Sequence, residues 1–172
     1  MLVNLSDVLT SEGKVENTAV SLEMNSFESR LGDFTITRKT PVTFTFTNAG
    51  VNKAKVEGKV ELTFETMCDR CLAEVSTTLC LEFDRIVMTP DAVTEDDEEL
   101  NFMEGYQLNV ETFVYHEILG NWPLKILCKE DCKGVCPKCG QNLNLGECGC
   151  DTFVPDPRMA AIKDIFNANK EV

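Results

Sequence analysis

The sequence is poor in histidine and lacks the short motifs of common catalytic sites. Its single histidine, His116, is followed by Glu-Ile-Leu-Gly, so the second histidine of an HExxH zinc helix is missing. There is no GxSxG elbow, no phosphate-binding P-loop and no GxGxxG turn. These absences argue against a metalloprotease, an α/β-hydrolase or a nucleotide-dependent enzyme, and we expect a protein that is not an enzyme.

Long hydrophobic runs are also missing. No stretch of about 18 apolar residues is present, so the sequence predicts no membrane span. The first residues, MLVNLSDVLTSEGK, lack the basic region, apolar core and cleavage site of a signal peptide. We therefore expect a cytoplasmic protein, in a compartment where thiols stay reduced and stable disulfides are rare.

Positive charge is scarce. The chain has 16 lysine and arginine residues against 29 aspartate and glutamate residues, for a formal net charge of -13. Part of the negative charge is concentrated in the run Glu95–Glu99. Phosphate backbones are bound largely through lysine and arginine, so extensive direct contact with RNA or DNA is disfavoured. A basic protein partner fits such a surface better.

Cysteine, in contrast, is abundant. Nine cysteines are present, and four close pairs account for all but one of them. The pairs are Cys68–Cys71, Cys128–Cys132, Cys136–Cys139 and Cys148–Cys150. A structural Zn²⁺ takes four ligands in a tetrahedron, and a short C-x₂₋₄-C pair supplies two of them from one turn. Four pairs therefore predict two complete four-thiolate sites, which are closed to catalysis.

The segment CPKCG, residues 136–140, is the strongest single signal for a metal. Its proline shapes the turn, and the glycine after the second cysteine permits a positive φ, so that backbone N–H groups can point at sulfur. Its expected partner is the CGC segment, which follows after a loop of eight residues. The first predicted site consists of Cys136, Cys139, Cys148 and Cys150. By elimination, the second consists of Cys68, Cys71, Cys128 and Cys132.

Other assignments stay open on sequence alone. Cys128 and Cys132 can instead share a metal with Cys136 and Cys139. The segment CDRC can also be read as a thioredoxin-type redox pair, but it ends a β-patterned run and does not open a helix. Iron suits a CPKCG knuckle, yet rubredoxin-like sites use two such knuckles and the second pair here is CGC, so zinc is preferred. Cys80, the ninth cysteine, is expected to be an ordinary buried thiol of a strand.

The fold is expected to be α+β. Residues 18–88 alternate apolar and polar side chains, which predicts an antiparallel sheet with one buried face. Apolar residues at helical spacing predict a helix over 108–120, which Pro123 limits. The expected parts are an antiparallel β-sheet region (1–89), an acidic loop (90–107), a helix and linker (108–127), a cysteine-rich zinc-binding segment (128–151) and a C-terminal tail with a short helix (152–172).

Glu117 falls within the apolar stripe of the expected helix. An unpaired carboxylate is costly in such a place. We therefore expect Glu117 to reach solvent or to pair with an arginine such as Arg70 or Arg158. His116 points away from the stripe and is expected to be exposed.

The motifs also follow a characteristic order along the chain. An acidic β-rich half leads into CDRCL at 68–72, and a helix with Glu-Ile-Leu precedes Trp-Pro. The block LCKEDCKGVCPKCGQNLNLGECGC at 127–150 and the segment DPRMAAIKDIF then follow. Over nearly its whole length the chain resembles the cysteine-rich form of the YceD family of large-ribosomal-RNA-subunit accumulation proteins. Besides the cysteines, the matching motif residues are Arg70, Glu117, Asp156, Pro157 and Arg158.

The resemblance implies a bacterial, cytoplasmic, non-enzymatic ribosome-biogenesis factor that is needed for accumulation of 23S ribosomal RNA. With the acidic charge, it favours binding to a basic ribosomal protein or to a large-subunit assembly intermediate. One or two structural zinc ions are the expected cofactors. The alternatives are a redox-regulated thiol chaperone and an iron-thiolate electron carrier.

Overall fold

The computed structural model describes residues 1–92 and 102–150. The chain divides into two compact units. The first, which we call the sheet unit, contains residues 1–68 and 73–128. The second, which we call the cysteine unit, contains residues 69–72 and the stretch that begins at Lys129.

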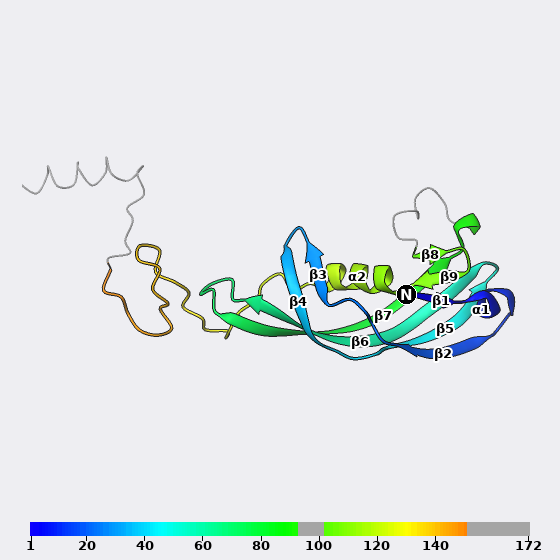
Figure 1. Ribbon diagram of the computed structural model, residues 1–172, viewed down its shortest axis with the longest axis horizontal. Helices are drawn as coiled ribbons and strands as arrows, with labels where there is room; N and C mark the ends of the chain where they lie inside the picture. Colours follow the sequence, from blue (N-terminus) through cyan, green and yellow to red (C-terminus); the bar gives the residue numbers. More distant parts are fainter. Residues whose placement is uncertain (93–101, 151–172) are drawn as a thin grey trace, which may run out of the picture. The chain divides into compact units, whose positions relative to one another are not determined.

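An antiparallel sheet forms most of the sheet unit, as the alternating sequence predicts (Figure 1). Its strand order is β2-β5-β6-β4-β3, and β7 pairs with β6. The long strand β6 is therefore the centre of the sheet, since it contacts β4, β5 and β7. The strands are β2 (Val15–Val20), β3 (Ser26–Ser29), β4 (Gly32–Lys39), β5 (Val42–Gly50), β6 (Lys53–Met67) and β7 (Glu74–Met88).

A small second sheet joins the start of the chain to the residues before the main helix. Strand β1 (Leu2–Asn4) pairs with β9 (Gln107–Asn109), which pairs with β8 (Met103–Glu104). Helix α1 (Ser6–Thr10) follows β1, and the 3₁₀ turn η1 (Pro90–Ala92) follows β7. The segment that we expected to be an acidic loop thus contains η1 and β8 in its described part.

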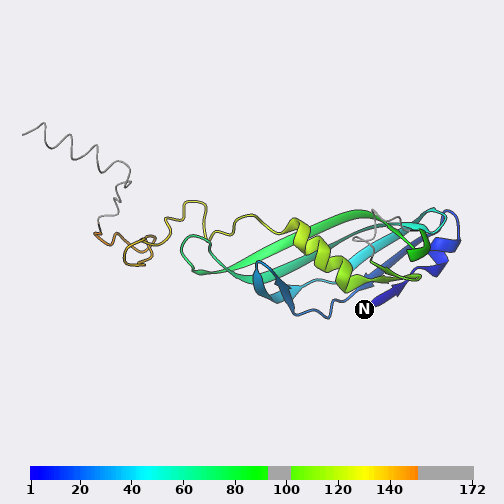
Figure 2. The ribbon, with the colours of Figure 1, turned by 90° about the horizontal axis from the view of Figure 1, so that it is seen from above.

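Helix α2 (Val110–Asn121) lies on the apolar face of the main sheet (Figure 2). Asn109 caps its start, because the Asn109 side chain accepts a hydrogen bond from the Thr112 N–H at 3.2 Å. The helix ends just before Trp122-Pro123, and the sequence predicts this end. Its buried residues meet a core rich in phenylalanine, and the Phe113 ring packs edge-on against Phe83 and Phe102.

Cys80 was expected to be buried, but its position on β7 places it on the exposed face. On β7, Leu79, Leu81 and Phe83 are buried, whereas Cys80 is exposed and lies opposite Glu61 of β6. Successive side chains of a strand point to opposite faces, so Cys80 shares the polar face with its neighbours two residues away. The prediction of a buried thiol was therefore wrong.

Several expectations fall on residues 151–172, outside the described residues. They are the C-terminal helix and the motif residues Asp156, Pro157 and Arg158. In the ranges 1–92 and 102–150, no helix is long and apolar enough to cross a membrane.

Candidate metal centres

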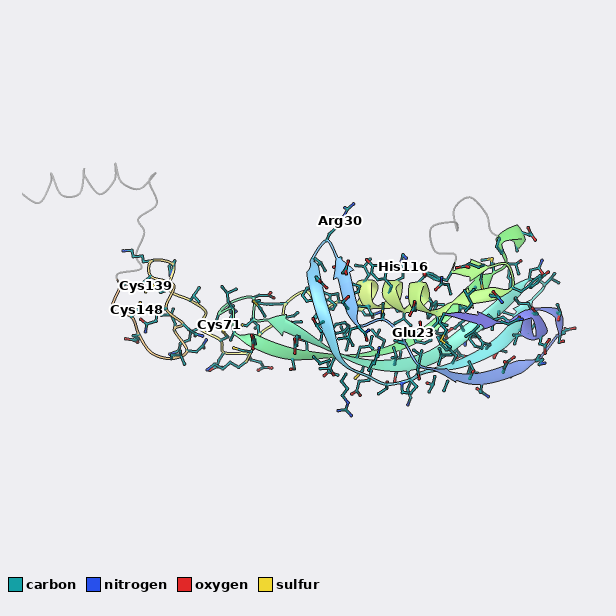
Figure 3. The ribbon with its side chains drawn as sticks, in the orientation of Figure 1. Glu23, Arg30, Cys71, His116, Cys139 and Cys148 are labelled. Atoms are coloured by element: carbon teal, nitrogen blue, oxygen red, sulfur yellow. The ribbon has the colours of Figure 1, made fainter. Side chains whose placement is uncertain are left out.

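Four cysteines of the cysteine unit meet around one point. The sulfur atoms of Cys136, Cys139, Cys148 and Cys150 all lie within 4.8 Å of one another, and Figure 3 labels Cys139 and Cys148. A tetrahedral thiolate site with bonds of about 2.3 Å has its sulfurs about 3.8 Å apart. These four residues can therefore hold a metal ion with little rearrangement, and they are the four that the CPKCG and CGC segments suggest.

The backbone of residues 136–141 forms the knuckle that positions the first pair. The Cys136 N–H donates to the Gln141 carbonyl at 2.8 Å, and the Gly140 N–H donates to the Cys136 carbonyl at 2.9 Å. Gly140 has φ 73°, which is why glycine suits the end of the turn. The Lys138 N–H points at the Cys136 sulfur from 3.4 Å. A backbone donor of this kind stabilises negative charge on sulfur.

Hydrogen bonds and burial shift the pKa values of Cys136 and Cys150 in opposite directions. Hydrogen bonds from the backbone N–H groups of Cys139 and Lys138 lower the pKa of the Cys136 thiol to about 6. Side-chain hydrogen bonding with Cys139 and Cys148, together with burial, raises the pKa of Cys150 to about 12. Ionisation of Cys136 is thus favoured, whereas ionisation of Cys150 is resisted. A divalent cation supplies the positive charge that allows four thiolates to coexist.

A second group of four sulfurs also lies within 4.8 Å. It consists of Cys68, Cys71, Cys128 and Cys132. Cys68, Cys71 and Cys132 are buried and Cys128 is exposed. The grouping is the one that elimination gave, and the alternative in which Cys128 and Cys132 join Cys136 and Cys139 is not seen. Within residues 1–92 and 102–150 no disulfide joins any two cysteines.

Asn144 is a site residue that the sequence reasoning missed. Its amide Nδ2 donates to the Cys132 sulfur at 3.3 Å, and its Oδ1 accepts the Lys133 N–H at 2.9 Å. A side chain that hydrogen-bonds a metal ligand fixes the ligand and tunes its charge. Asparagine in a loop is too common to signal this role, and only the fold brings it to the sulfur.

Arg70, one of the motif residues, belongs to the cysteine unit. Its Nη1 donates to the Cys132 carbonyl at 2.8 Å, and its own carbonyl accepts the Val135 N–H at 3.1 Å. Its role in the structure is to hold the turn of residues 69–72 against the backbone of residues 132–135. None of these hydrogen bonds involves Glu117, so the suggested Arg70–Glu117 pair is not formed.

The partner of Glu117 is Arg85, which we did not foresee. Glu117 is only 5% exposed, and its carboxylate accepts from the Nε and Nη2 atoms of Arg85 at 2.7 and 3.4 Å. The hydrogen bond and charge of Glu117 raise the pKa of the Arg85 guanidinium. The nearby His116 was expected to be exposed. It is instead half-buried, with its ring against that of Phe102. The Arg85–Glu117 pair fixes α2 on β7.

The described part of the cysteine unit has almost no hydrophobic core. Among its described residues, the buried apolar side chains are Cys71, Cys132 and Cys136. Leu72 and Leu145 are exposed by 67% and 85%. A segment without an aliphatic core needs another source of stability, and metal coordination supplies it in small domains.

About two thirds of the chain matches a known protein family. The family model described as "Large ribosomal RNA subunit accumulation protein YceD" matches residues 56–166. The match begins on β6, includes all four cysteine pairs and extends past the described residues.

The curated relatives are distant. Uncharacterized protein Rv2926c of Mycobacterium tuberculosis and Uncharacterized protein Mb2951c of Mycobacterium bovis are each 24% identical to this chain over 107 residues. The alignment covers 60% of this chain and 51% of each relative, so the chain spans about half the length of the curated relatives it matches. No solved structure matches the chain.

Proposed function

The chain belongs to the YceD family of large ribosomal RNA subunit accumulation proteins, and from this premise we propose that it supports accumulation of 23S ribosomal RNA without being an enzyme. It does so by binding a basic ribosomal protein or a large-subunit assembly intermediate. The observation that carries this proposal is the charge, since a chain of net charge -13 repels naked RNA and attracts the basic proteins that RNA otherwise binds.

We further propose that both cysteine groups hold structural Zn²⁺. All-thiolate sites are closed, so zinc there stabilises the fold and leaves no open position for a substrate. Each site adds two positive charges and removes four thiol protons, which takes the net charge from -13 to about -17. Zinc thus strengthens the preference for a basic partner.

Metal content is the direct test of the zinc proposal. Elemental analysis of the full chain, purified under reducing conditions without a histidine tag, is expected to give two zinc ions per chain. Cys136→Ser and Cys71→Ser are each expected to lower this to one, whereas Cys80→Ser leaves it at two. Iron with visible absorption would point to the electron carrier, and metal release on reversible disulfide formation would point to the redox chaperone.

Binding competition tests the partner. Zinc-loaded full-length protein is offered purified large-subunit proteins and, separately, naked 23S RNA fragments at low and physiological salt. We expect a complex with one or more basic large-subunit proteins that weakens as salt rises, because the attraction is screened over about 8 Å at physiological ionic strength. A preference for the naked RNA would refute the proposal.

A further inference from the structure

Strand β7 forms one long edge of the described sheet. Its residues Glu74–Met88 pair with β6 along their full length. In the part of the chain that the structure describes, no strand pairs with the other edge of β7, and its backbone hydrogen bonds run to β6 alone. In an antiparallel pair, every second residue directs its N–H and C=O away from the partner. A row of backbone donors and acceptors is therefore available.

Several common protections of an edge strand are missing from β7, although it carries charged side chains and the inward-facing Arg85. Sheet edges are commonly guarded by lysine, proline, a bulge or short length. The sequence of β7, EVSTTLCLEFDRIVM, contains neither lysine nor proline. Its pairing with β6 runs in continuous register from Glu74 to Met88, without a bulge. Such an edge is suited to receive another strand.

The polar face beside this edge is acidic. On β7 it carries Glu74, Glu82 and Asp84, and on β6 it carries Glu57, Glu61 and Glu65. Three lysines of β6 offset part of this charge: Lys53, Lys55 and Lys59. Lys55 is already held by Glu57 at 2.7 Å and Asp84 at 3.1 Å. The one basic residue of β7, Arg85, faces α2 and is engaged by Glu117.

A hollow on the same face adds to this charge. It has a volume of about 440 Å³, and its lining carries three carboxylates and one ammonium group. Two of the carboxylates, Glu57 and Asp84, are paired with Lys55. The lining residues are Thr43, Glu57, Gly58, Lys59, Glu82, Phe83 and Asp84. A long basic side chain from the edge can place its charge between these carboxylates.

We infer that the free edge of β7 binds an extended basic segment of a partner protein as an added antiparallel or parallel strand. Backbone hydrogen bonds give the affinity, and alternate lysine or arginine side chains meet Glu74, Glu82 and Asp84. This inference rests on the proposed function, because it names the surface and the binding mode for the basic partner.

Charge decides between a basic partner and a second copy of this chain. Two β7 strands side by side would bring together acidic residues with no lysine on either strand, and like charges across neighbouring strands are destabilising. A basic segment meets opposite charges in the same places. RNA offers neither strand hydrogen bonds nor positive charge.

A labelled peptide in which lysine alternates with valine and threonine is the probe. Its binding to zinc-loaded full-length protein is measured by fluorescence anisotropy at about 0.15 M salt. Two further peptides carry N-methyl groups on the even or on the odd residues, which keeps the charge and removes half of the backbone donors. We expect one of these two to bind at least about tenfold more weakly than the parent peptide. Equal binding by all three would overturn the inference.

Charge-reversal variants test the location of the site. Glu82→Lys with Asp84→Lys is expected to weaken peptide binding at least about tenfold. Glu12→Lys with Asp33→Lys changes the net charge equally at exposed positions away from β7 and is expected to leave affinity within about twofold, because distant charges are screened. Equal losses in the two variants would overturn the inference.

Hydrogen exchange of the unaltered protein gives a readout that does not depend on a variant folding. Peptide binding is expected to protect β7 amides that exchange rapidly in the free protein. Absence of such protection at saturating peptide would overturn the inference, as would β7 protection that rises with protein concentration alone. If the peptide fails but purified large-subunit proteins still bind, the edge is wrong and the proposed function stands.

Discussion

At the scale of single residues, Arg85 and Glu117 form the charged contact that decides how α2 sits on the sheet. The Glu117 side chain is 6% exposed, whereas that of Arg85 is 58% exposed. The carboxylate is thus removed from water while its partner keeps much of its hydration. Breaking such a pair from the arginine side leaves a buried charge with little compensation.

We therefore expect Arg85→Ala to lower the free energy of unfolding by about 1 to 3 kcal/mol. Urea unfolding followed by the fluorescence of Trp122, the single tryptophan, measures it. Trp122 packs against Phe27, Phe34 and Phe64, so its emission reports on the sheet core. The control is Arg30→Ala, which removes an exposed arginine in the turn after β3 and should change stability little (Figure 3). Similar losses in the two variants would contradict the role of the pair.

The thiols of the first cysteine group give a second prediction at this scale. Metal binding needs four thiolates, but the pKa of Cys150 is raised to about 12 and that of Cys148 is also raised. At Cys148 the Cys150 N–H lowers the pKa, but hydrogen bonding with the Cys136 and Cys139 side chains, together with burial, leaves it raised. Zinc must therefore displace protons at neutral pH, and its affinity must fall as pH falls.

We expect zinc binding to this group at pH 7.5 to release at least about two protons per ion. Calorimetry in buffers of different ionisation enthalpy measures the release. A variant with Cys71→Ser and Cys132→Ser isolates the first group, and it should lose zinc progressively as the pH is lowered towards the Cys136 pKa of about 6. Proton release near zero would contradict the thiolate site.

At the scale of elements, Gly58 of β6 lies between β5 and β7 where there is no room for a side chain. A Cβ at Gly58 of β6 would lie 2.0 Å from the Thr43 carbonyl oxygen and 2.8 Å from Cε2 of Phe83. The first neighbour is backbone and cannot move aside cheaply. The absence of a side chain at this position lets the strands approach and lets Phe83 pack beneath them.

Gly58→Ala is consequently expected to cost about 2 kcal/mol or more in the free energy of unfolding, through overpacking. Gly120→Ala is the matched control, because Gly120 lies in α2 with nothing within 4 Å of the added Cβ. It should raise stability by up to about 1 kcal/mol, since alanine favours a helix over glycine. Thermal unfolding by circular dichroism compares the two. A harmless Gly58→Ala would show that the sheet relaxes there.

At the scale of the whole molecule, the two units draw their stability from different sources. The sheet unit has a continuous core that runs from Leu5 of the N-terminal segment to Ile118 of α2. The cysteine unit, over its described residues, buries little besides cysteine. Burial of apolar surface stabilises the first, and coordination by sulfur must stabilise the second.

Removal of metal should therefore affect the units unequally. With a zinc chelator under reducing conditions, we expect residues 129–150 to lose protection against amide exchange, while β5 and β6 stay protected. Exchange followed by mass spectrometry resolves the two regions, and readdition of zinc should restore protection in 129–150. Equal loss of protection in both regions would mean that the sheet unit also depends on metal.

Much of the sheet unit could be predicted from local patterns. Alternation over 18–88 and the helical stripe over 108–120 correspond to strands β2–β7 and to α2 (Val110–Asn121). Elements β1, α1, β8 and β9 were not foreseen, because segments of two to five residues have no periodicity to detect and exist through pairing with distant residues. The prediction for Cys80 was wrong although the sequence shows that it lies two residues from the polar Thr78 and Glu82, and residues two apart in a strand share a face.

The sequence by itself determined which cysteines can bind metal and how they pair locally, because C-x₂-C, C-x₃-C and C-x-C spacings act within one turn. It also determined the acidic charge and the family. Only the tertiary structure decided that Arg85 holds Glu117, that Asn144 reaches Cys132 and that β7 lies at an edge of the described sheet. Contacts between residues far apart in the chain depend on how strands register and stack, and no local spacing encodes that arrangement.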